Sequence, residues 1–442
     1  MLANDHGVFY VLIIMKSRTS FLFVSAVFLC LLAFSCEKTE TYEYYEPKIY
    51  IRAVPDNQRV KLYFYLCNQY LSSFPGFPGF NCTPDLNAYF DVYQMNPDGT
   101  EKAKLASNVT DSFYVEGLTN GVNAYFKLKS RVGRTRTGES EIVATTPDVY
   151  APLERLPLPQ PSLISSFPYY SPDFNKLVQA FYVDTFSGAE IKQFEPPETR
   201  YAPINFSGPV NWDASSRYIM GTTYNYTGSA SIYYSLPYLY DTETDSLRLY
   251  NNLGNYDLQV PFLAPDLQHF YFLSNENNTY EYGLWTANLD GSQRRRLAPG
   301  FKFTYASPNY LYNQSLISLS GAKDGSAVFA SFYTYFDNDE DGLYQINPAT
   351  GEFVRLLDGA WQVQSAHPSP DNQRVVFLSF RSGEFAFWTL DLSTGEVRQV
   401  ASLPRNVSIS TQNPIYWADN NHILVGAVTF TGYAFYKIAI NI

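Results

Sequence analysis

Short apolar runs separated by polar turns follow one another through most of the chain. The clearest unit extends from Ser369 to Leu403 and holds three such runs, Arg374–Phe380, Phe385–Leu392 and Val397–Leu403. The turns between them are Ser382-Gly383 and Ser393-Thr394-Gly395-Glu396. Runs of this length, rich in β-branched and aromatic residues and bounded by turn residues, predict β-strands joined by tight turns.

An aspartate in the turn before the first strand marks each looser copy of this unit. The six turn aspartates are Asp173, Asp213, Asp266, Asp324, Asp371 and Asp419, with spacings of 40, 53, 58, 47 and 48 residues. Periods near 40–50 residues with several strands each predict a β-propeller, because radial stacking buries the faces that a single blade would leave exposed.

The second half of each unit contributes an outer strand. We expect outer strands at Ile191–Phe194, Leu247–Tyr250, Arg295–Leu297, Phe353–Leu356 and Val397–Val400. The sixth unit ends at Phe435–Ile440 without such a strand, whereas Leu153–Leu156 has the same pattern just before the first unit. We therefore predict that Leu153–Leu156 completes the sixth blade and closes the ring, which removes unpaired sheet edges.

The order Ser369-Pro370-Asp371, apolar strand, aromatic strand, Asp391-Leu392-Ser393-Thr394-Gly395-Glu396 resembles the PD40 repeats of TolB-type six-bladed propellers. The resemblance covers about residues 150–442 and is weakest in the first two units. The same repeats occur in prolyl oligopeptidase-like peptidases, where the hydrolase domain is separate from the propeller. The resemblance implies a six-bladed propeller over residues 149–442.

Residues 47–148 hold seven further short apolar runs with turn signals between them. The expected strands are Lys48–Val54, Arg59–Leu66, Ala88–Gln94, Glu101–Ala106, Ser112–Glu116, Asn123–Val132 and Glu141–Thr145. Seven such strands predict a β-sandwich. The run from Val115 to Leu128 resembles the E–F corner of a fibronectin type III domain, in which a Leu and a later Tyr pack across the corner. The early Trp of that family is missing, and Tyr63 or Phe64 takes its place.

The N-terminal region predicts export and lipid attachment. Met15-Lys16-Ser17-Arg18 and the apolar run Phe21–Phe34 form a secretory signal over residues 1–35, with the true start at Met15. The run ends in Leu32-Ala33-Phe34-Ser35-Cys36, which resembles a bacterial lipobox and implies acylation of Cys36. Residues 36–46 form an acidic tether, which favours display on the outer-membrane surface; the periplasmic face is the alternative.

Composition agrees with an all-β protein and argues against nucleic acid as a partner. Tyr and Phe number 38 and 33, and charged residues make up 17% of the chain. The formal net charge is −11, whereas phosphate binding needs clustered cations. The basic cluster Arg294-Arg295-Arg296 lies at an expected edge strand, where positive charge discourages edge pairing.

We find no catalytic pattern in the sequence. There is no G-x-S-x-G motif, and His269, His367 and His422 lack the spacing of paired metal ligands. We expect these three histidines to be structural. The strongest exception is His367, which lies near an expected inner strand, where side chains approach the central channel.

One acidic segment has the spacing of a calcium loop. Asp337, Asp339 and Asp341 precede Gly342 in the pattern D-x-D-x-D-G, in which alternate carboxylates can converge on a hard cation. The later ligand positions of an EF-hand hold Gln345 and Pro348 instead. A calcium site and a solvated acidic hairpin both remain open; no other cofactor is expected.

An unusually long loop is expected after the second strand. Cys67 and Cys82 bracket this segment, and a disulfide between them is expected in an exported protein. The loop also carries Phe74, Phe77 and Phe80 among Pro and Gly. These three side chains either form an exposed contact site or pack as a plug against protein.

These features together predict a non-enzymatic, lipid-anchored protein of the cell envelope. The propeller would serve as a docking platform for an envelope or extracellular protein or another ligand. A carbohydrate-binding surface lipoprotein is the alternative, with exposed aromatic rings stacking on sugars. A hydrolase or lyase that uses the propeller channel is a third hypothesis.

Overall fold

A computed structural model of the 442-residue chain describes most of residues 47–440. Not described within that span are residues 75–76, 86, 133–134, 151–152, 157–168, 174, 184–185, 194–196, 203–209, 226–233, 254–257, 276–280, 305–315, 334–338, 403–406, 410–414 and 430–431. The chain falls into two compact units, one of residues 1–46 and 68–83 and one of residues 47–67 and 84–442. The predicted domain boundaries at residues 46/47 and 148/149 stay predictions.

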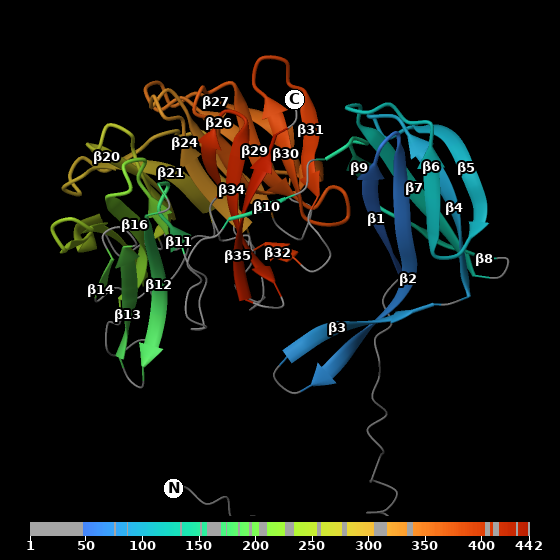
Figure 1. Ribbon diagram of the computed structural model, residues 1–442, viewed down its shortest axis with the longest axis horizontal. Helices are drawn as coiled ribbons and strands as arrows, with labels where there is room; N and C mark the ends of the chain where they lie inside the picture. Colours follow the sequence, from blue (N-terminus) through green and yellow to red (C-terminus); the bar gives the residue numbers. More distant parts are fainter. Residues whose placement is uncertain are drawn as a thin grey trace, which may run out of the picture. The chain divides into compact units, whose positions relative to one another are not determined.

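Two antiparallel sheets precede the repeats (Figure 1). The first contains β1 (Lys48–Asp56), β2 (Arg59–Phe74), β3 (Phe77–Pro84) and β6 (Ser112–Glu116). The second contains β5 (Glu101–Val109), β4 (Ala88–Met95), β7 (Ala124–Val132), β8 (Thr135–Glu139) and β9 (Val143–Thr145). Alternate residues of both sheets, among them Leu62, Phe90 and Phe126, form one buried core. The seven expected strands are present, and a sandwich of two sheets results.

The structure corrects the prediction of a long loop after the second strand. β2 continues to Phe74, and β3 begins at Phe77 and pairs with it, so the segment is a hairpin of two strands. Pro and Gly dominate its centre and concealed the strand pattern on both sides of the turn. β8 was likewise missed, because Thr135–Glu139 is polar and shows no apolar alternation.

Six sheets among the described residues share one plan, in which four strands follow one another in antiparallel order. Blade one is formed by β11 (Tyr169–Tyr170), β12 (Lys176–Val183), β13 (Phe186–Gln193) and β14 (Glu198–Ala202). Blade two is formed by β15 (Asn211–Trp212), β16 (Tyr218–Asn225), β17 (Tyr234–Asp241) and β18 (Ser246–Leu249). Blade three is formed by β19 (Leu258–Leu263), β20 (His269–Ser274), β21 (Glu281–Asn288) and β22 (Arg295–Arg296). β23 (Phe303–Thr304) also pairs with β21.

Blades four to six repeat this plan. Blade four is formed by β24 (Leu316–Gly321), β25 (Val328–Tyr333), β26 (Gly342–Ile346) and β27 (Phe353–Asp358). Blade five is formed by β28 (Val363–Pro368), β29 (Arg374–Ser379), β30 (Ala386–Asp391) and β31 (Val397–Ser402). Blade six is formed by β33 (Tyr416–Asp419), β34 (His422–Thr429), β35 (Gly432–Ala439) and β10 (Glu154–Arg155). β32 (Val407–Ile409) also pairs with β34, and two short 3-10 helices occur at η1 (Asn251–Leu253) and η2 (Gly359–Trp361).

The cores of the repeats lie between neighbouring blades, which explains why the second strand of blade five is apolar throughout. Val375 and Phe377 of β29 pack in the cluster shared with blade four, whereas Val376 and Leu378 pack in the cluster shared with blade six. Similar clusters join blades one and two, two and three, and three and four. The described residues therefore form the six-bladed β-propeller that the repeats predict.

The ring closes as the sequence predicts. Glu154 and Arg155 of β10 pair with Lys437 and Tyr436 of β35 (Figure 1). The backbone N–H of Leu156 donates to the carbonyl of Phe435 at 2.8 Å, and Leu153 packs on the core of blades five and six. One expected outer strand is wrong. Ile191–Gln193 belongs to β13, and β14 forms the outer edge of blade one, because its strands are longer than those of blade five.

Replacing Leu156 by proline tests this closure. Proline removes the N–H that donates to the carbonyl of Phe435, so we expect the free energy of unfolding to fall by about 1 to 2 kcal/mol. Leu156→Ala, which keeps the N–H, serves as the control for the lost side chain. Urea unfolding followed by circular dichroism measures both; equal losses in the two variants would show that the Leu156 hydrogen bond does not contribute to closure.

Blade five also contacts the first two sheets. The hydroxyl of Thr145 donates to the amide oxygen of Gln399 at 2.7 Å, and the N–H of Ala53 donates to the carbonyl of Ser382 at 2.8 Å. Gly383 has a φ of +82°, and a Cβ added there would lie 1.9 Å from the carbonyl oxygen of Ile51. The turn that the sequence places at Ser382-Gly383 therefore needs glycine both for its backbone and for this close approach.

Candidate functional site

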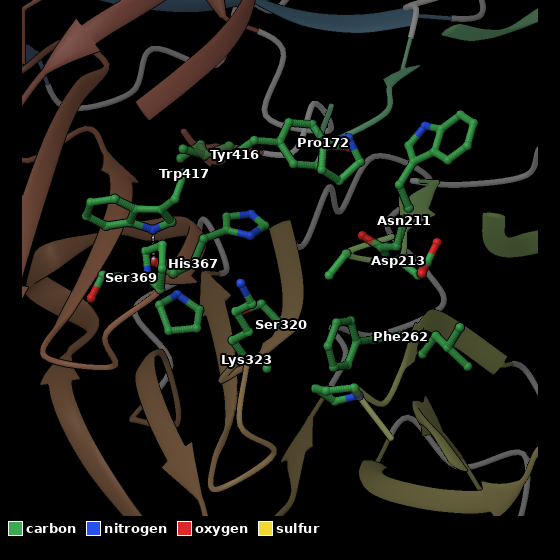
Figure 2. Close-up of a pocket in the computed structure, with 18 of the residues that line it drawn as sticks. Pro172, Asn211, Asp213, Phe262, Ser320, Lys323, His367, Ser369, Tyr416 and Trp417 are labelled. Carbon is green, nitrogen blue, oxygen red and sulfur yellow. Dashed lines mark hydrogen bonds between the residues drawn. The ribbon is translucent and has the colours of Figure 1, made fainter. Parts of the chain in front are cut away.

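A cavity lined by all six blades lies at the ends of the innermost strands. It has a volume of about 680 Å³, and each of the six blades contributes to its lining. Representative lining residues, one from each blade in order, are Pro172, Trp212, Phe262, Ser320, His367 and Trp417. Figure 2 shows His367 and Ser320 on one side of this cavity and Asn211 and Asp213 across it. We call it the central pocket.

Two tryptophans of the central pocket also connect neighbouring blades. The indole N–H of Trp212 donates to the carbonyl of Tyr169 in blade one at 3.2 Å. The indole N–H of Trp417 in blade six donates to the carbonyl of His367 in blade five at 3.0 Å. Each tryptophan thus has a satisfied N–H, which fixes the ring where it lines the pocket.

Phe262 adds a third aromatic wall to the central pocket. Its ring stacks on Tyr271 with centroids 6.2 Å apart and an interplanar angle of 16°. Gly321 of the next blade makes room for it, because a Cβ at that glycine would lie 2.5 Å from the Phe262 ring. The pocket wall is therefore set by packing between blades three and four.

Most polar groups of the central pocket already have partners within the protein. Asp213 is 8% exposed and accepts hydrogen bonds from the N–H groups of Ser215, Arg217 and Tyr218. The hydroxyl of Ser320 donates to the carbonyl of Ala366 at 2.7 Å. These hydrogen bonds hold the inner strands in place.

The turn aspartates share one structural role. Each accepts a hydrogen bond from the N–H two residues later, as Asp371 does from Gln373 at 3.1 Å. Burial raises the pKa of the Asp371 carboxyl, but the hydrogen bonds from Ser369 and Gln373 outweigh it and leave the pKa below its usual value. The carboxylates that mark the repeats in the sequence therefore stabilise turns.

Two of the three histidines also belong to these turns, which agrees with the structural role predicted for them. Nδ1 of His269 lies 2.8 Å from Asp266, and Nδ1 of His422 lies 2.9 Å from Asp419. Both pairs are three residues apart in the same turn. Each imidazole adds a second partner for the carboxylate that shapes the turn.

His367 is the histidine that faces the central pocket, as its predicted place on an inner strand suggests. Nε2 lies 3.2 Å from the hydroxyl of Ser365 on the same strand, β28. Burial lowers the pKa of His367 to about 4, because the cationic form loses part of its hydration inside the protein. The imidazole is therefore neutral near pH 7 and can offer one donor and one acceptor.

The acidic segment proposed for calcium is only partly described. Asp337 lies outside the described residues, Asp339 is exposed, and Asp341 is 2% exposed. The guanidinium of Arg355 donates to the backbone carbonyl of Asp341. Among the described residues, no three His, Cys, Asp or Glu side chains gather as metal ligands would. The calcium site stays a prediction.

The remaining predicted site residues are tested little by the structure. Cys36 lies outside the described residues. Cys67 is disulfide-bonded, and its predicted pairing with Cys82 stays a prediction, because the side chain of Cys82 is not described. Phe74, Phe77 and Phe80 lie on the strands β2 and β3, and their side chains are likewise outside the description.

The basic cluster at blade three has structural partners. Arg294 lies over the Trp285 ring at 4.3 Å, and its guanidinium donates to the carbonyl of Leu253. Arg296 donates to the carbonyl of Phe301 at 3.1 Å.

No helix within the described part of the chain has the length and apolar character needed to span a bilayer.

The sequence predicted a central channel approached by His367, but it did not predict the aromatic residues that line the pocket there. Trp212 and Trp417 each precede or nearly precede a turn aspartate and helped to mark the repeats. The only signal for a pocket was their recurrence at the same place in two blades. Which side chains meet in the middle depends on the closure of the whole ring, and a single unit does not show this.

No known protein family profile matches the chain, and no curated protein matches it in sequence. Among solved structures, a putative TolB from Agrobacterium tumefaciens is similar at 14% identity with a TM-score of 0.39, over 63% of this chain and 90% of that one. An oligogalacturonate lyase from Vibrio parahaemolyticus is similar at 11% identity with a TM-score of 0.43, over 90% and 98%.

A further structure, of an oligogalacturonate lyase in complex with manganese, is similar at 11% identity with a TM-score of 0.42, over 88% of this chain and 99% of that one. Because these TM-scores lie below 0.5, we base the proposals below on the residues of this chain.

Proposed function

We propose that the protein is a non-catalytic binding protein of the cell envelope and that the central pocket is its docking site. The observation that carries this proposal is the convergence of all six blades on one cavity of about 680 Å³ with aromatic walls. A cavity of this size, lined by apolar and aromatic residues together with several polar groups, is typical of ligand sites. The ligand is a protein segment or a small molecule of the envelope.

The pocket is rigid, which favours docking. Its walls are fixed by indole hydrogen bonds between blades and by the stack of Phe262 on Tyr271. A preformed site loses little conformational freedom when it binds. The carboxylate of Asp213 and the hydroxyl of Ser320 already form hydrogen bonds with the protein backbone. Because these groups stabilise the inner strands, the pocket favours ligand binding over acid–base catalysis.

The location in the envelope is part of the same proposal. Acylation of Cys36 would anchor the chain to the outer membrane, with residues 36–46 as the tether and surface display preferred over the periplasmic face. The first two sheets would act as a fibronectin type III-like spacer before a TolB-like propeller. The lipobox-like sequence Leu32–Cys36 supports the proposed anchor. The arrangement of two sheets around one core supports the proposed spacer.

Carbohydrate capture is the second candidate. Trp212, Phe262 and Trp417 line the pocket, and aromatic rings of this kind stack on the apolar faces of sugars. A hydrolase or lyase is the third candidate, and His367 would then be the residue to examine first. A glycan array that retains the protein through these rings would favour capture over protein docking.

Two arginine variants at the mouth of the pocket test the docking proposal. Ala214 and Ala418 are exposed and line the pocket, so Ala214→Arg and Ala418→Arg narrow its mouth without changing a core. We expect each to reduce the ligand retained from solubilised envelopes at least tenfold. Val354→Arg, at a 53% exposed position on the outer strand β27, is the matched control.

The comparison has a clear negative outcome. Equal retention by wild type, Ala418→Arg and Val354→Arg would place binding elsewhere on the molecule. Turnover of a retained glycan or peptide by the wild type, lost in His367→Gln, would replace the binding proposal with an enzymatic one.

A further inference from the structure

The outer face of the sheet β1-β2-β6 carries a cluster of exposed tyrosines with lysines among them. Its six members, which we call the tyrosine–lysine face, are Lys48, Tyr50, Lys61, Tyr63, Tyr65 and Tyr114. Residues between them, such as Ile49 and Leu62, point into the core, so strand alternation turns these six outward. Tyr50, Tyr65 and Tyr114 are 37%, 44% and 48% exposed. Such clustering on a surface marks an interaction site more often than scattered rings do.

Cross-strand pairing joins the members into one surface. Tyr50 lies opposite Tyr65, and their rings stack with centroids 5.1 Å apart. Lys61 lies opposite Tyr114, and its ammonium is 5.0 Å from that ring and 4.5 Å from the ring of Tyr63. The rings thus supply an apolar surface with hydroxyl tips, and ammonium groups sit among them.

The acids near this face lie mainly beside the arginines at its border, and one of them, Glu116, lies opposite Arg59 on the same side of the sheet as Tyr114. Among the described residues, no carboxylate forms an ion pair with Lys61, whose partners are the two tyrosines. The ammonium of Lys48 lies 3.8 Å from the carboxylate of Glu141, and both side chains are more than half exposed. An ion pair this exposed contributes little to stability. At the border, Arg59 and Arg52 are paired with Asp56 and Glu384. The lysines therefore remain available to a partner on a chain whose net charge is −11.

We propose that the tyrosine–lysine face lies against the anionic headgroup layer of the membrane. Tyrosine is favoured at membrane interfaces, where its ring meets apolar surface and its hydroxyl meets water, and lysine is attracted to lipid phosphates. The face is built on β1, whose first residue, Lys48, belongs to it. This inference rests on the proposed lipid attachment at Cys36, because that anchor keeps the face near a membrane.

The length of the tether supports the membrane as the occupant. Eleven residues, 37 to 47, separate Cys36 from Lys48. A fully extended chain of that length reaches about 40 Å, and a flexible one spans about 20 Å on average. At such distances the membrane is present at high effective concentration, so a weak surface affinity is enough to orient the protein.

Vesicle co-sedimentation tests the proposal. The chain from residue 37 to 442, which lacks the acylated cysteine and begins before every described strand, is mixed with vesicles of phosphatidylcholine containing phosphatidylglycerol. We expect binding that weakens with salt and falls about thirtyfold in Lys48→Ala/Lys61→Ala, since each lysine near an anionic surface contributes about a fivefold gain. Tyr50→Ser/Tyr65→Ser is expected to weaken binding at any salt concentration.

A charge-matched control separates the face from net charge. Lys102→Ala/Lys302→Ala removes two exposed lysines outside the face and should bind as wild type does. No binding of wild type to anionic vesicles, or equal loss in both double variants, would overturn the proposal. Binding to soluble polygalacturonate through Lys48 and Lys61 but not to vesicles would replace the membrane with an acidic polysaccharide.

The outcome is independent of lipid attachment. Mass spectrometry of the protein from membranes reports acylation of Cys36 separately. Acylation without vesicle binding overturns only the role of the face. Vesicle binding without acylation removes the anchor from the proposed function and leaves the face as a membrane contact of its own.

Discussion

Replacement of Trp388 by alanine is expected to lower the free energy of unfolding by about 3 to 5 kcal/mol, the usual cost of removing a large buried aromatic side chain. Trp388 lies on β30, is 0% exposed and pairs across the sheet with Phe377. Its ring meets Trp361 edge-on at 5.3 Å, within the core that blades four and five share. Alanine would leave a cavity between blades four and five. The two blades could fill this cavity only by shifting toward each other, which would distort the closed propeller.

Urea unfolding measures this loss. Trp388→Phe keeps most of the volume and should cost clearly less than the alanine variant. Val354→Ala, at a 53% exposed position on β27, should change the free energy of unfolding by less than about 0.5 kcal/mol. If Trp388→Ala unfolds within about 1 kcal/mol of wild type, the shared core between blades four and five is not closely packed.

Acidification from pH 6.5 to pH 4 is expected to destabilise the protein through His367. Burial lowers the pKa of His367 to about 4 in the folded protein, against 6.5 in its absence. Between these values the unfolded chain binds a proton that the folded protein does not, so stability falls as the pH falls. The full shift corresponds to a loss of about 3 kcal/mol, reached near pH 4.

The variant His367→Gln isolates this contribution. It removes the titrating group, so its free energy of unfolding should change little over the same pH window. Asp391, at the end of β30, acts at lower pH, because hydrogen bonds lower its pKa to about 2, and the stabilisation it provides is lost only below about pH 4. A wild-type slope in His367→Gln would show that another group governs the response.

The propeller could be predicted from the sequence because its signals are local. Each turn aspartate accepts hydrogen bonds from the next few N–H groups, so its spacing to the following strand is constrained. Strands such as Arg374–Ser379 are buried on both faces and therefore read as continuous apolar runs. Closure by Leu153–Leu156 could be predicted because the sixth unit lacks an outer strand and this segment has the pattern of one.

The central pocket and the tyrosine–lysine face could not be predicted in the same way. The pocket is formed by residues from all six blades, and only the closed ring brings Trp212, Phe262 and Trp417 to one cavity. The face depends on which side of β1 and β2 turns outward and on cross-strand register. The hairpin of β2 and β3 was missed because Pro and Gly at its centre imitate a loop.

The E–F corner shows both outcomes within one motif. Leu118 packs on the core of the first two sheets, as the fibronectin-like pattern predicts. Tyr125 instead packs on the cluster that contains Ala144 and residues of blades four and five. The fibronectin type III assignment stays a prediction, because the partner of this tyrosine is a distant repeat and not the core of its own two sheets.

Photo-crosslinking from the central pocket tests the docking function most directly. A benzophenone amino acid at position 418, at the mouth of the pocket, is compared in intact cells with the same residue at position 354 on the outer strand of blade four. The proposed function predicts a light-dependent adduct with one defined partner from position 418 and none from position 354. The absence of any adduct at position 418, or the same adducts from both positions, would contradict it.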